Sequence, residues 1–140
     1  MRDIRDSDYR RLLELRTGLR RFLRWSEEAA EAEGITPAQH QLMLAVRGHA
    51  DPRGPTIKDV ATCLVAKHHS AVELVDRACA AGLLRRVPDA SDHRSVRLRL
   101  TAAGSRRLAH LSRRHLEELE RIAPQLGSLV AGVDTVPIRA

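Results

Sequence analysis

Hydrophobic residues recur every three or four positions over residues 7–33, with charged residues between them. The stripe runs from Leu12 through Leu19 to Ala30. This spacing is typical of an amphipathic helix, which turns once every 3.6 residues. The pattern therefore predicts a long first helix, which Gly34 ends.

A second helix is predicted over residues 37–49. Thr36 is a favoured N-cap residue, and Pro37 is favoured in the first helical turn. Leu42 belongs to the apolar stripe that we expect to face the core. The loop over residues 50–55 is rich in proline and glycine and cannot continue the helix.

Two short helices joined by a tight turn are predicted next. Thr56 with Asp59 three residues later is a variant of the capping box that starts many helices. A new helical pattern covers residues 68–81, so residues 65–67 must form a turn. Two helices joined in this way form a helix-turn-helix. Four residues of its second helix are expected in the core: Val72, Val75, Ala78 and Cys79.

After Gly82 the hydrophobic period changes from that of a helix to that of a strand. Residues 96–100 alternate apolar side chains with Arg97 and Arg99, and residues 88–94 are rich in turn-forming types. This pattern predicts a β-hairpin with one apolar and one basic face.

The last helix is expected over residues 102–131, with Thr101 as its cap. Pro124 should end or restart this helix, because proline cannot donate the helical hydrogen bond. The tail from Gly132 lacks periodicity, and we expect it to be frayed.

Length and composition place the chain among cytoplasmic globular proteins. Its 140 residues suit a single domain, and 43% of them are hydrophobic. No apolar run approaches the roughly 20 residues of a membrane span, and the charged N-terminus is unlike a signal peptide. Cys63 and Cys79 are too few for a disulfide framework and lack the spacing of a zinc site.

The position of the basic residues is more informative than their sum. The chain has 24 basic and 18 acidic residues and a formal charge of +6. Residues 1–33 are neutral overall, whereas residues 85–99 hold five arginines and two aspartates. Only three aromatic residues are present, which disfavours stacking on single-stranded nucleic acid. The basic hairpin beside a helix-turn-helix favours a contact with duplex DNA.

The order of these elements resembles the MarR family of winged helix-turn-helix transcription regulators. Six segments in the same order and at similar spacing carry the resemblance: 36–42, 56–61, 71–77, 81–86, 89–94 and 100–104. The fold class expected is therefore mainly α with a small β-hairpin. The resemblance implies a homodimer, with residues 7–33 and 102–131 as dimerisation helices around a DNA-binding region at 36–101. Independently, each terminal helix has an apolar stripe that a chain of this length can hardly cover by itself.

The predicted DNA contacts lie on the second helix of the helix-turn-helix and on the hairpin. The first turn of that helix should enter the major groove, so four residues are candidates for base edges: His68, His69, Ser70 and Glu73. Lys67 cannot cap the helix and is expected to contact a phosphate. Arg94 is expected in a narrow minor groove, oriented by Asp92. Arg97 and Arg99 are further candidates for phosphate contacts, whereas Arg77 and Arg86 could equally form internal ion pairs with Asp59 or Asp76.

The resemblance also implies a small aromatic or phenolic effector between the dimerisation helices and the winged helix. The residues that would line this cleft are Arg21, Arg24, Trp25, His40 and Met43. A sole tryptophan such as Trp25 is more often a packing residue than a ligand-binding one. No metal or cofactor is predicted, because His110 and His115 do not share a helical face. Cys79 is expected in the core, and Cys63 could be partly exposed.

The function predicted is that of a sequence-specific regulator of transcription that reads a pseudo-palindromic operator as a homodimeric, ligand-responsive repressor. The alternative is an architectural or protein-binding winged helix without an effector. An enzyme is not expected, since the sequence has no phosphate loop, nucleophile elbow or zinc-protease motif.

Overall fold

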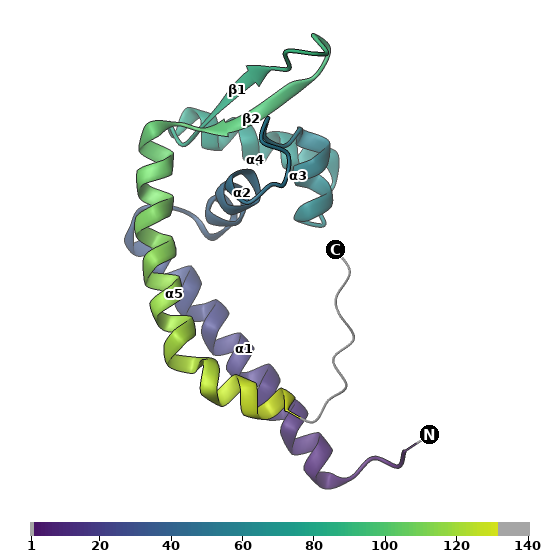
Figure 1. The fold of residues 1–140 in the computed structure, drawn as a ribbon. Coiled ribbons are helices and arrows are strands. Elements are labelled where there is room, and N and C mark those ends of the chain that lie inside the picture. The colour runs from purple at the N-terminus through teal and green to yellow at the C-terminus, as the bar shows by residue number, and fades with distance from the viewer. Residues whose placement is uncertain (1, 132–140) are drawn as a thin grey trace. The chain divides into compact units, whose positions relative to one another are not determined.

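The computed structural model describes residues 2–131. It contains five helices and one hairpin, in the order α1 (Asp6–Ala32), α2 (Pro37–Arg47), α3 (Ile57–Cys63), α4 (His68–Ala80), β1 (Leu84–Pro88), β2 (Val96–Leu100) and α5 (Ala102–Val130) (Figure 1). These bounds confirm the predicted fold class and element order. The predicted frayed tail from Gly132 lies outside the described residues.

The chain divides into two compact units. One comprises the residues up to Ser26 together with those from Arg114 onwards, and the other comprises residues 27–113. The first unit is a pair of helical segments from α1 and α5. The second holds α2, α3, α4 and the hairpin, together with the adjoining ends of α1 and α5.

Residues 27–113 form a winged helix around one apolar core. Its buried members come from all three short helices and both strands: Leu42, Val46, Val60, Val75, Ala78, Leu84 and Leu98. The strands are antiparallel, and Leu84 lies opposite Leu100 while Arg85 lies opposite Arg99. Because successive strand residues point to opposite faces, Leu98 and Leu100 share one face of β2 and Arg97 and Arg99 share the other. The predicted separation does not extend to β1, where Arg86 lies opposite Leu98 and Val87 lies opposite Arg97.

Local caps define where the helices begin. Thr36 and Thr56 each accept a hydrogen bond from the backbone three residues on, and each capping box is complete. Thr101 plays the same part for α5, because its Oγ1 accepts from Gly104 N at 2.9 Å. The same hydroxyl donates to Gly82 O at 2.6 Å, so it joins the start of α5 to the end of α4. The three predicted caps are confirmed.

The prediction for Pro124 is wrong, because α5 continues through it to Val130. Proline removes one helical hydrogen bond and leaves the carbonyl four residues earlier without its partner. Pro124 lies on an exposed face of the helix, where water can bond that carbonyl.

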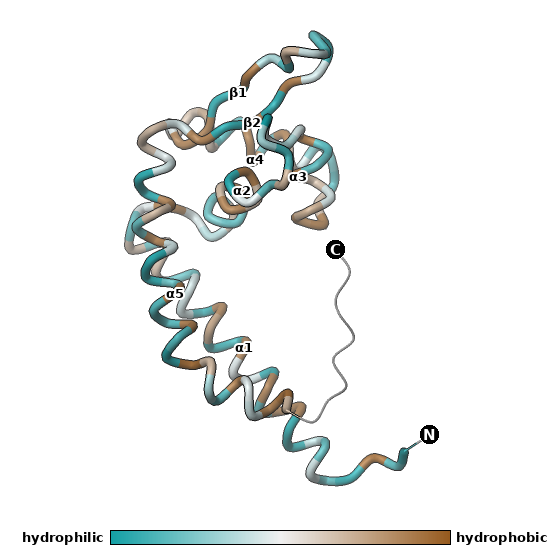
Figure 2. The backbone as a smooth tube through the Cα atoms, in the orientation of Figure 1, coloured by the Kyte–Doolittle hydropathy of each residue, from teal (hydrophilic) through white to brown (hydrophobic). Residues whose placement is uncertain are grey.

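Apolar residues recur along α1 and α5 (Figure 2). Several of the large ones are exposed. Within the first unit the two helices approach closely at Gly18, where an added Cβ would lie 3.0 Å from Leu126 Cδ2. Phe22 and Trp25 stack with their centroids 6.1 Å apart, and His115 meets the edge of Trp25 at 4.9 Å. Among the described residues, no helix is both long and apolar enough to cross a membrane.

Candidate nucleic-acid interface

The first turn of α4 presents polar side chains to solvent. His68, His69, Ser70 and Glu73 are all exposed, while Ala71, Val75 and Ala78 on the opposite side of the helix are buried. This division follows from helical periodicity, which places residues 71, 75 and 78 on one face. The structure therefore brings the four predicted base-reading residues together on one open surface.

The turn before α4 departs from the usual chemistry of a helix start. Lys67 occupies the N-cap position and makes no side-chain cap bond, as the sequence predicted. Two residues earlier, Val65 has a φ of 52° and a side chain that is 94% exposed. A β-branched residue is strained in this left-handed region, which glycine or asparagine adopts more easily.

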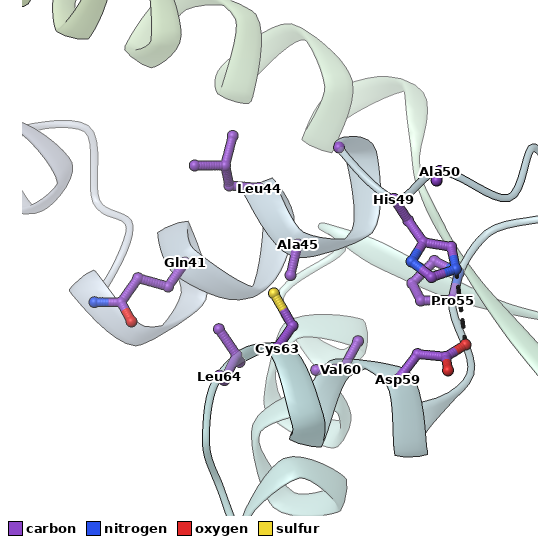
Figure 3. A pocket seen from close by; sticks show the side chains of 11 residues that line it. Gln41, Leu44, Ala45, His49, Ala50, Pro55, Asp59, Val60, Cys63 and Leu64 are labelled. Atoms are coloured by element: carbon purple, nitrogen blue, oxygen red, sulfur yellow. Dashed lines mark ion pairs between the residues drawn. The ribbon is translucent and has the colours of Figure 1, made fainter. Parts of the chain in front are cut away.

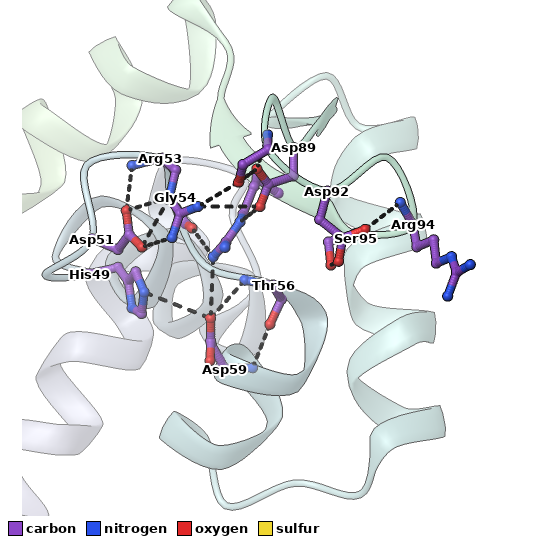
Figure 4. A network of polar contacts seen from close by, with 12 residues as sticks. His49, Asp51, Arg53, Gly54, Thr56, Asp59, Asp89, Asp92, Arg94 and Ser95 are labelled. Carbon is purple, nitrogen blue, oxygen red and sulfur yellow. Dashed lines mark hydrogen bonds and ion pairs between the residues drawn. The ribbon is translucent and has the colours of Figure 1, made fainter.

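The hairpin is fastened to the rest of the winged helix by buried polar contacts around Asp89 (Figure 4). The carboxylate of Asp89 is 2% exposed and accepts from Arg97 Nε at 2.9 Å. Ser91 donates to the same carboxylate through its backbone N–H and its hydroxyl, both at 2.9 Å. Arg53 approaches it at 3.6 Å from the preceding loop. The Ser91 N–H, and then the Arg97 guanidinium, hold the pKa of Asp89 well below its usual range.

The same network reaches the start of α3. Arg97 NH1 donates to Gly54 O at 3.2 Å and lies 3.9 Å from Asp59 Oδ2. Asp59 also accepts from the backbone of Thr56, which lowers its pKa. We refer to Arg53, Asp59, Asp89 and Arg97 together as the wing anchor.

The wing anchor corrects the expectation that Arg97 belongs to an open basic face. Its side chain is only 14% exposed and is used within the protein. The reason is that the loop before α3 runs along the edge of β2, where Leu98 N donates to Pro55 O at 2.8 Å. Arg99 remains exposed but donates to Pro52 O of that loop.

Arg94 differs from Arg97 in both exposure and direction. Its guanidinium points away from the wing anchor (Figure 4), and the residue is exposed. Asp92 accepts a hydrogen bond from the backbone N–H of Arg94 at 3.0 Å and shapes the turn there. Asp92 therefore orients the chain at Arg94 through the backbone. Arg86 pairs with Asp76, which confirms one of the internal ion pairs considered above.

The predicted effector residues fall into the two separate units. Arg21 and Trp25 line a cavity of about 320 Å³ in the first unit, together with Phe22, and Arg24 is exposed on the same helix. His40 and Met43 lie in the second unit and are 7% and 0% exposed. Met43 is a core residue without open surface, which corrects its expected place in a cleft.

A different cavity of about 450 Å³ lies between α2 and α3 (Figure 3). Its walls are mainly apolar, with Leu44, Val60 and Cys63 among them, and His49 pairs with Asp59 at 3.7 Å beside it. Cys63 is exposed, whereas Cys79, expected in the core, is only half-buried against it. Among residues 2–131, no three metal-ligating side chains cluster at one point.

Sequence reasoning missed the wing anchor. Asp89 with Ser91 two residues on is the pattern of a local turn in which a carboxylate accepts backbone hydrogen bonds. That signal was available, but it does not reveal that Arg53 and Arg97 converge on the same carboxylate. Arg97 reaches Asp89 through the register of the hairpin, whereas Arg53 reaches it only through the path of the loop before α3.

A sequence model of the MarR family matches residues 33–95. Most of the winged helix therefore resembles the MarR family. The resemblance to the MarR family inferred from the six segments is therefore confirmed over these residues.

Solved MarR structures share the fold. Apo MarR from Escherichia coli is 20% identical, with a TM-score of 0.69 over 96% of this chain and 100% of that one. A MarR family protein from Bacillus stearothermophilus is 20% identical, with a TM-score of 0.73 over 94% and 86%. A mutant of MepR from S. aureus, bound to an oligodeoxyribonucleotide, is 19% identical, with a TM-score of 0.65 over 89% and 86%.

One curated relative adds a local match. The LexA repressor of Magnetococcus marinus is 40% identical over 58 residues. The match covers 40% of this chain and a quarter of the length of that repressor.

Proposed function

We propose that this MarR-like chain binds double-stranded DNA in a sequence-specific manner and regulates transcription. The observation that carries this proposal is the open first turn of α4 beside a wing that is anchored from within. An anchored wing can present Arg94 to DNA without losing its shape. The MepR relative, whose solved structure includes an oligodeoxyribonucleotide, supports the same reading.

The roles of the residues follow from their chemistry. His68, His69, Ser70 and Glu73 can donate to or accept from base edges in the major groove. Lys67 lies at the turn, where an ammonium group suits a phosphate. The exposed guanidinium of Arg94 suits the negative potential of a narrow, A·T-rich minor groove. Arg99 remains a weaker candidate for a phosphate contact, and we assign Arg97 to the wing anchor instead.

We further propose that the protein acts as a homodimer on a pseudo-palindromic operator. Leu12, Leu19 and Leu23 on α1 are 56%, 45% and 56% exposed, and Leu116 on α5 is 61% exposed. Leucines at this exposure along two long helices favour burial against a second copy. A two-fold dimer would place two winged helices on two half-sites.

Repression and an effector response are the finer parts of the proposal. The matched relative is a repressor by name, which favours repression within a bacterial cytoplasm. The cavity lined by Arg21, Phe22 and Trp25 offers two aromatic rings and a cation, which suits an aromatic acid. A thermal-shift screen with aromatic acids tests this, and a Trp25→Leu variant should lose any shift that the cavity causes.

Selection of random duplexes on the purified protein tests DNA recognition. We expect an enriched palindrome. His69→Ala should relax preference at one base pair of each half-site by about 1–3 kcal/mol. Arg94→Ala should weaken binding mainly where the flanks are rich in A·T. Arg113→Ala removes the same charge from an exposed position on α5 and serves as the control.

Two results would contradict the proposal. One is that His69→Ala and Arg94→Ala bind random and selected duplexes as the parent does. The other is a monomer in light scattering at every concentration tested, which would refute the dimer. An architectural or protein-binding winged helix is the alternative, and it predicts that no sequence is enriched.

A further inference from the structure

A polar pocket lies at the base of the wing, in the unit formed by residues 27–113. Its volume is about 450 Å³, and the end of α2, the loop before α3, the hairpin and the first turns of α5 contribute to its walls. Its polar and charged lining residues are Arg47, His49, Asp51, Arg85, Arg99 and Ser105. This pocket is separate from the apolar cavity between α2 and α3, although His49 lines both.

Three arginines surround this space without matching carboxylates. Arg85 and Arg99 are directly opposite each other in the hairpin, and Arg47 is the last residue of α2. Like charges at opposed strand positions destabilise a sheet. Within residues 2–131, neither Arg47 nor Arg85 has an ion-pair partner, and Arg99 donates to the backbone carbonyl of Pro52.

The acidic groups near the pocket are already used elsewhere. Asp51 accepts from Arg53 at 2.8 Å, and the hydrogen bonds from the Arg53 side chain and backbone hold the pKa of Asp51 at about 2. Asp59 pairs with His49 and is bonded by the backbone of Thr56. Neither carboxylate therefore balances the three arginines, and the pocket has an excess of positive charge.

We propose that this pocket binds a small, multiply charged oxyanion, of the class of phosphate-bearing metabolites. Guanidinium groups form paired hydrogen bonds with phosphate and carboxylate oxygens, and three of them can neutralise a group of charge −2 or more. The volume is in the range of small-molecule sites, so it admits a phosphate together with part of the molecule that carries it. Ser105 adds a hydroxyl that can donate to the same group.

An anion in this pocket would act on the wing through the loop before α3. Pro52 and Gly54 line the pocket, and the same loop supplies Arg53 and the Gly54 carbonyl to the wing anchor. A ligand that bonds Arg85 and Arg99 would compete for the contact between Arg99 and Pro52. Regulation of DNA affinity in this way rests on the proposed function, whereas binding of the anion does not.

Isothermal titration with inorganic pyrophosphate, at constant ionic strength and without DNA, tests the site. Arg85→Gln and Arg47→Gln should each weaken binding by about tenfold, since each removes a charge-assisted pair. Arg113→Gln removes the same charge from an exposed position outside the pocket and should change the affinity by less than about twofold. A melting temperature for each variant verifies that it is folded.

The results distinguish binding at a specific anion site from nonspecific electrostatic attraction of pyrophosphate. Equal affinities for the parent, Arg85→Gln and Arg113→Gln would overturn the proposal. It would also be overturned if Arg85→Gln left pyrophosphate binding unchanged but reduced DNA affinity and its salt dependence, because the arginines would then contact DNA phosphates. Pyrophosphate binding that depends on Arg85, in a protein that selects no duplex, would support the anion site and contradict the proposed function.

Discussion

Replacing Arg97 with glutamine should destabilise the protein, whereas replacing Arg94 with glutamine should not. Both substitutions remove one charge from the same hairpin, so their long-range electrostatic effects are matched. They differ in what the side chain touches. Arg97 Nε lies 2.9 Å from the buried carboxylate of Asp89, and its NH1 bonds Gly54 O. Arg94 points outward from the wing anchor.

The size of the effect follows from what Arg97→Gln leaves behind. Removing one partner of a buried ion pair typically costs about 3–5 kcal/mol, because the other charge loses its compensation. Two features reduce this cost here. Ser91 still donates twice to Asp89, and Arg53, whose side chain is 51% exposed, lies close enough to move toward it. We therefore expect Arg97→Gln to lower the free energy of unfolding by about 2 kcal/mol.

Urea denaturation at one fixed protein concentration measures this difference, because the proposed dimer would make stability depend on concentration. For Arg94→Gln the loss should stay below about 0.5 kcal/mol, as for other surface substitutions. Duplex affinity, measured under conditions where both variants are folded, should fall for Arg94→Gln. If Arg97→Gln kept the stability of the parent and lost DNA affinity as Arg94→Gln does, Arg97 would be a phosphate contact, and its assignment to the wing anchor would be wrong.

Three other substitutions test the local geometry. Val65→Gly should stabilise the protein by about 0.5–1 kcal/mol in urea denaturation. It removes the strain of a left-handed backbone at a β-branched residue, and this gain is partly offset because glycine raises the entropy of the unfolded chain. A loss of stability would contradict this prediction. Gly104→Ala should cost about 2–3 kcal/mol, since the added Cβ would lie 2.1 Å from Leu83 O, and an unchanged melting temperature would show that α5 can move. Asp89→Asn should be less stable than the parent by a margin that is constant from about pH 5 to 7. Because the pKa of Asp89 is lowered from 3.8, that margin should shrink as the pH falls below 3.8, and a margin that widened in acid would refute the role of the ionised carboxylate.

Features that depend on neighbouring residues could be predicted from the sequence. The capping boxes at Thr36 and Thr56 need only a hydroxyl and a side-chain acceptor three residues later. Helical periodicity predicts the buried positions Val75 and Ala78 of α4 correctly, whereas Val72 and Cys79, also expected in the core, are only half-buried. The alternation of β2 likewise predicts which of its faces is buried, although it does not fix the pairing with β1, where Val87 lies opposite Arg97.

Features that depend on contacts between distant segments could not be predicted from the sequence. Pro124 is a helix-ending residue by its own chemistry, and only its exposed position on α5 explains why the helix continues. Met43 fits the apolar pattern of a core residue and equally the lining of a cleft, and the packing of α2 decides between them. For Arg97, the deciding contacts are with the loop before α3, more than 30 residues earlier in the chain.

The arginines of the hairpin show why residue type and alternation do not determine function. Arg97 and Arg99 are two residues apart on one strand and share a face, yet Arg97 is enclosed by the wing anchor and Arg99 borders an open pocket. Arg94 lies in the turn and faces neither the wing anchor nor the pocket. The loop before α3 makes the difference, because Gly54 O accepts from Arg97 and Pro55 O from the backbone of Leu98, whereas Arg99 meets only the carbonyl of Pro52 at the pocket's rim. The path of the adjoining loop therefore separates Arg97, which forms a structural ion pair, from Arg99, which lines the proposed anion site. Arg94, the proposed DNA contact, lies outside the strand in the turn before it.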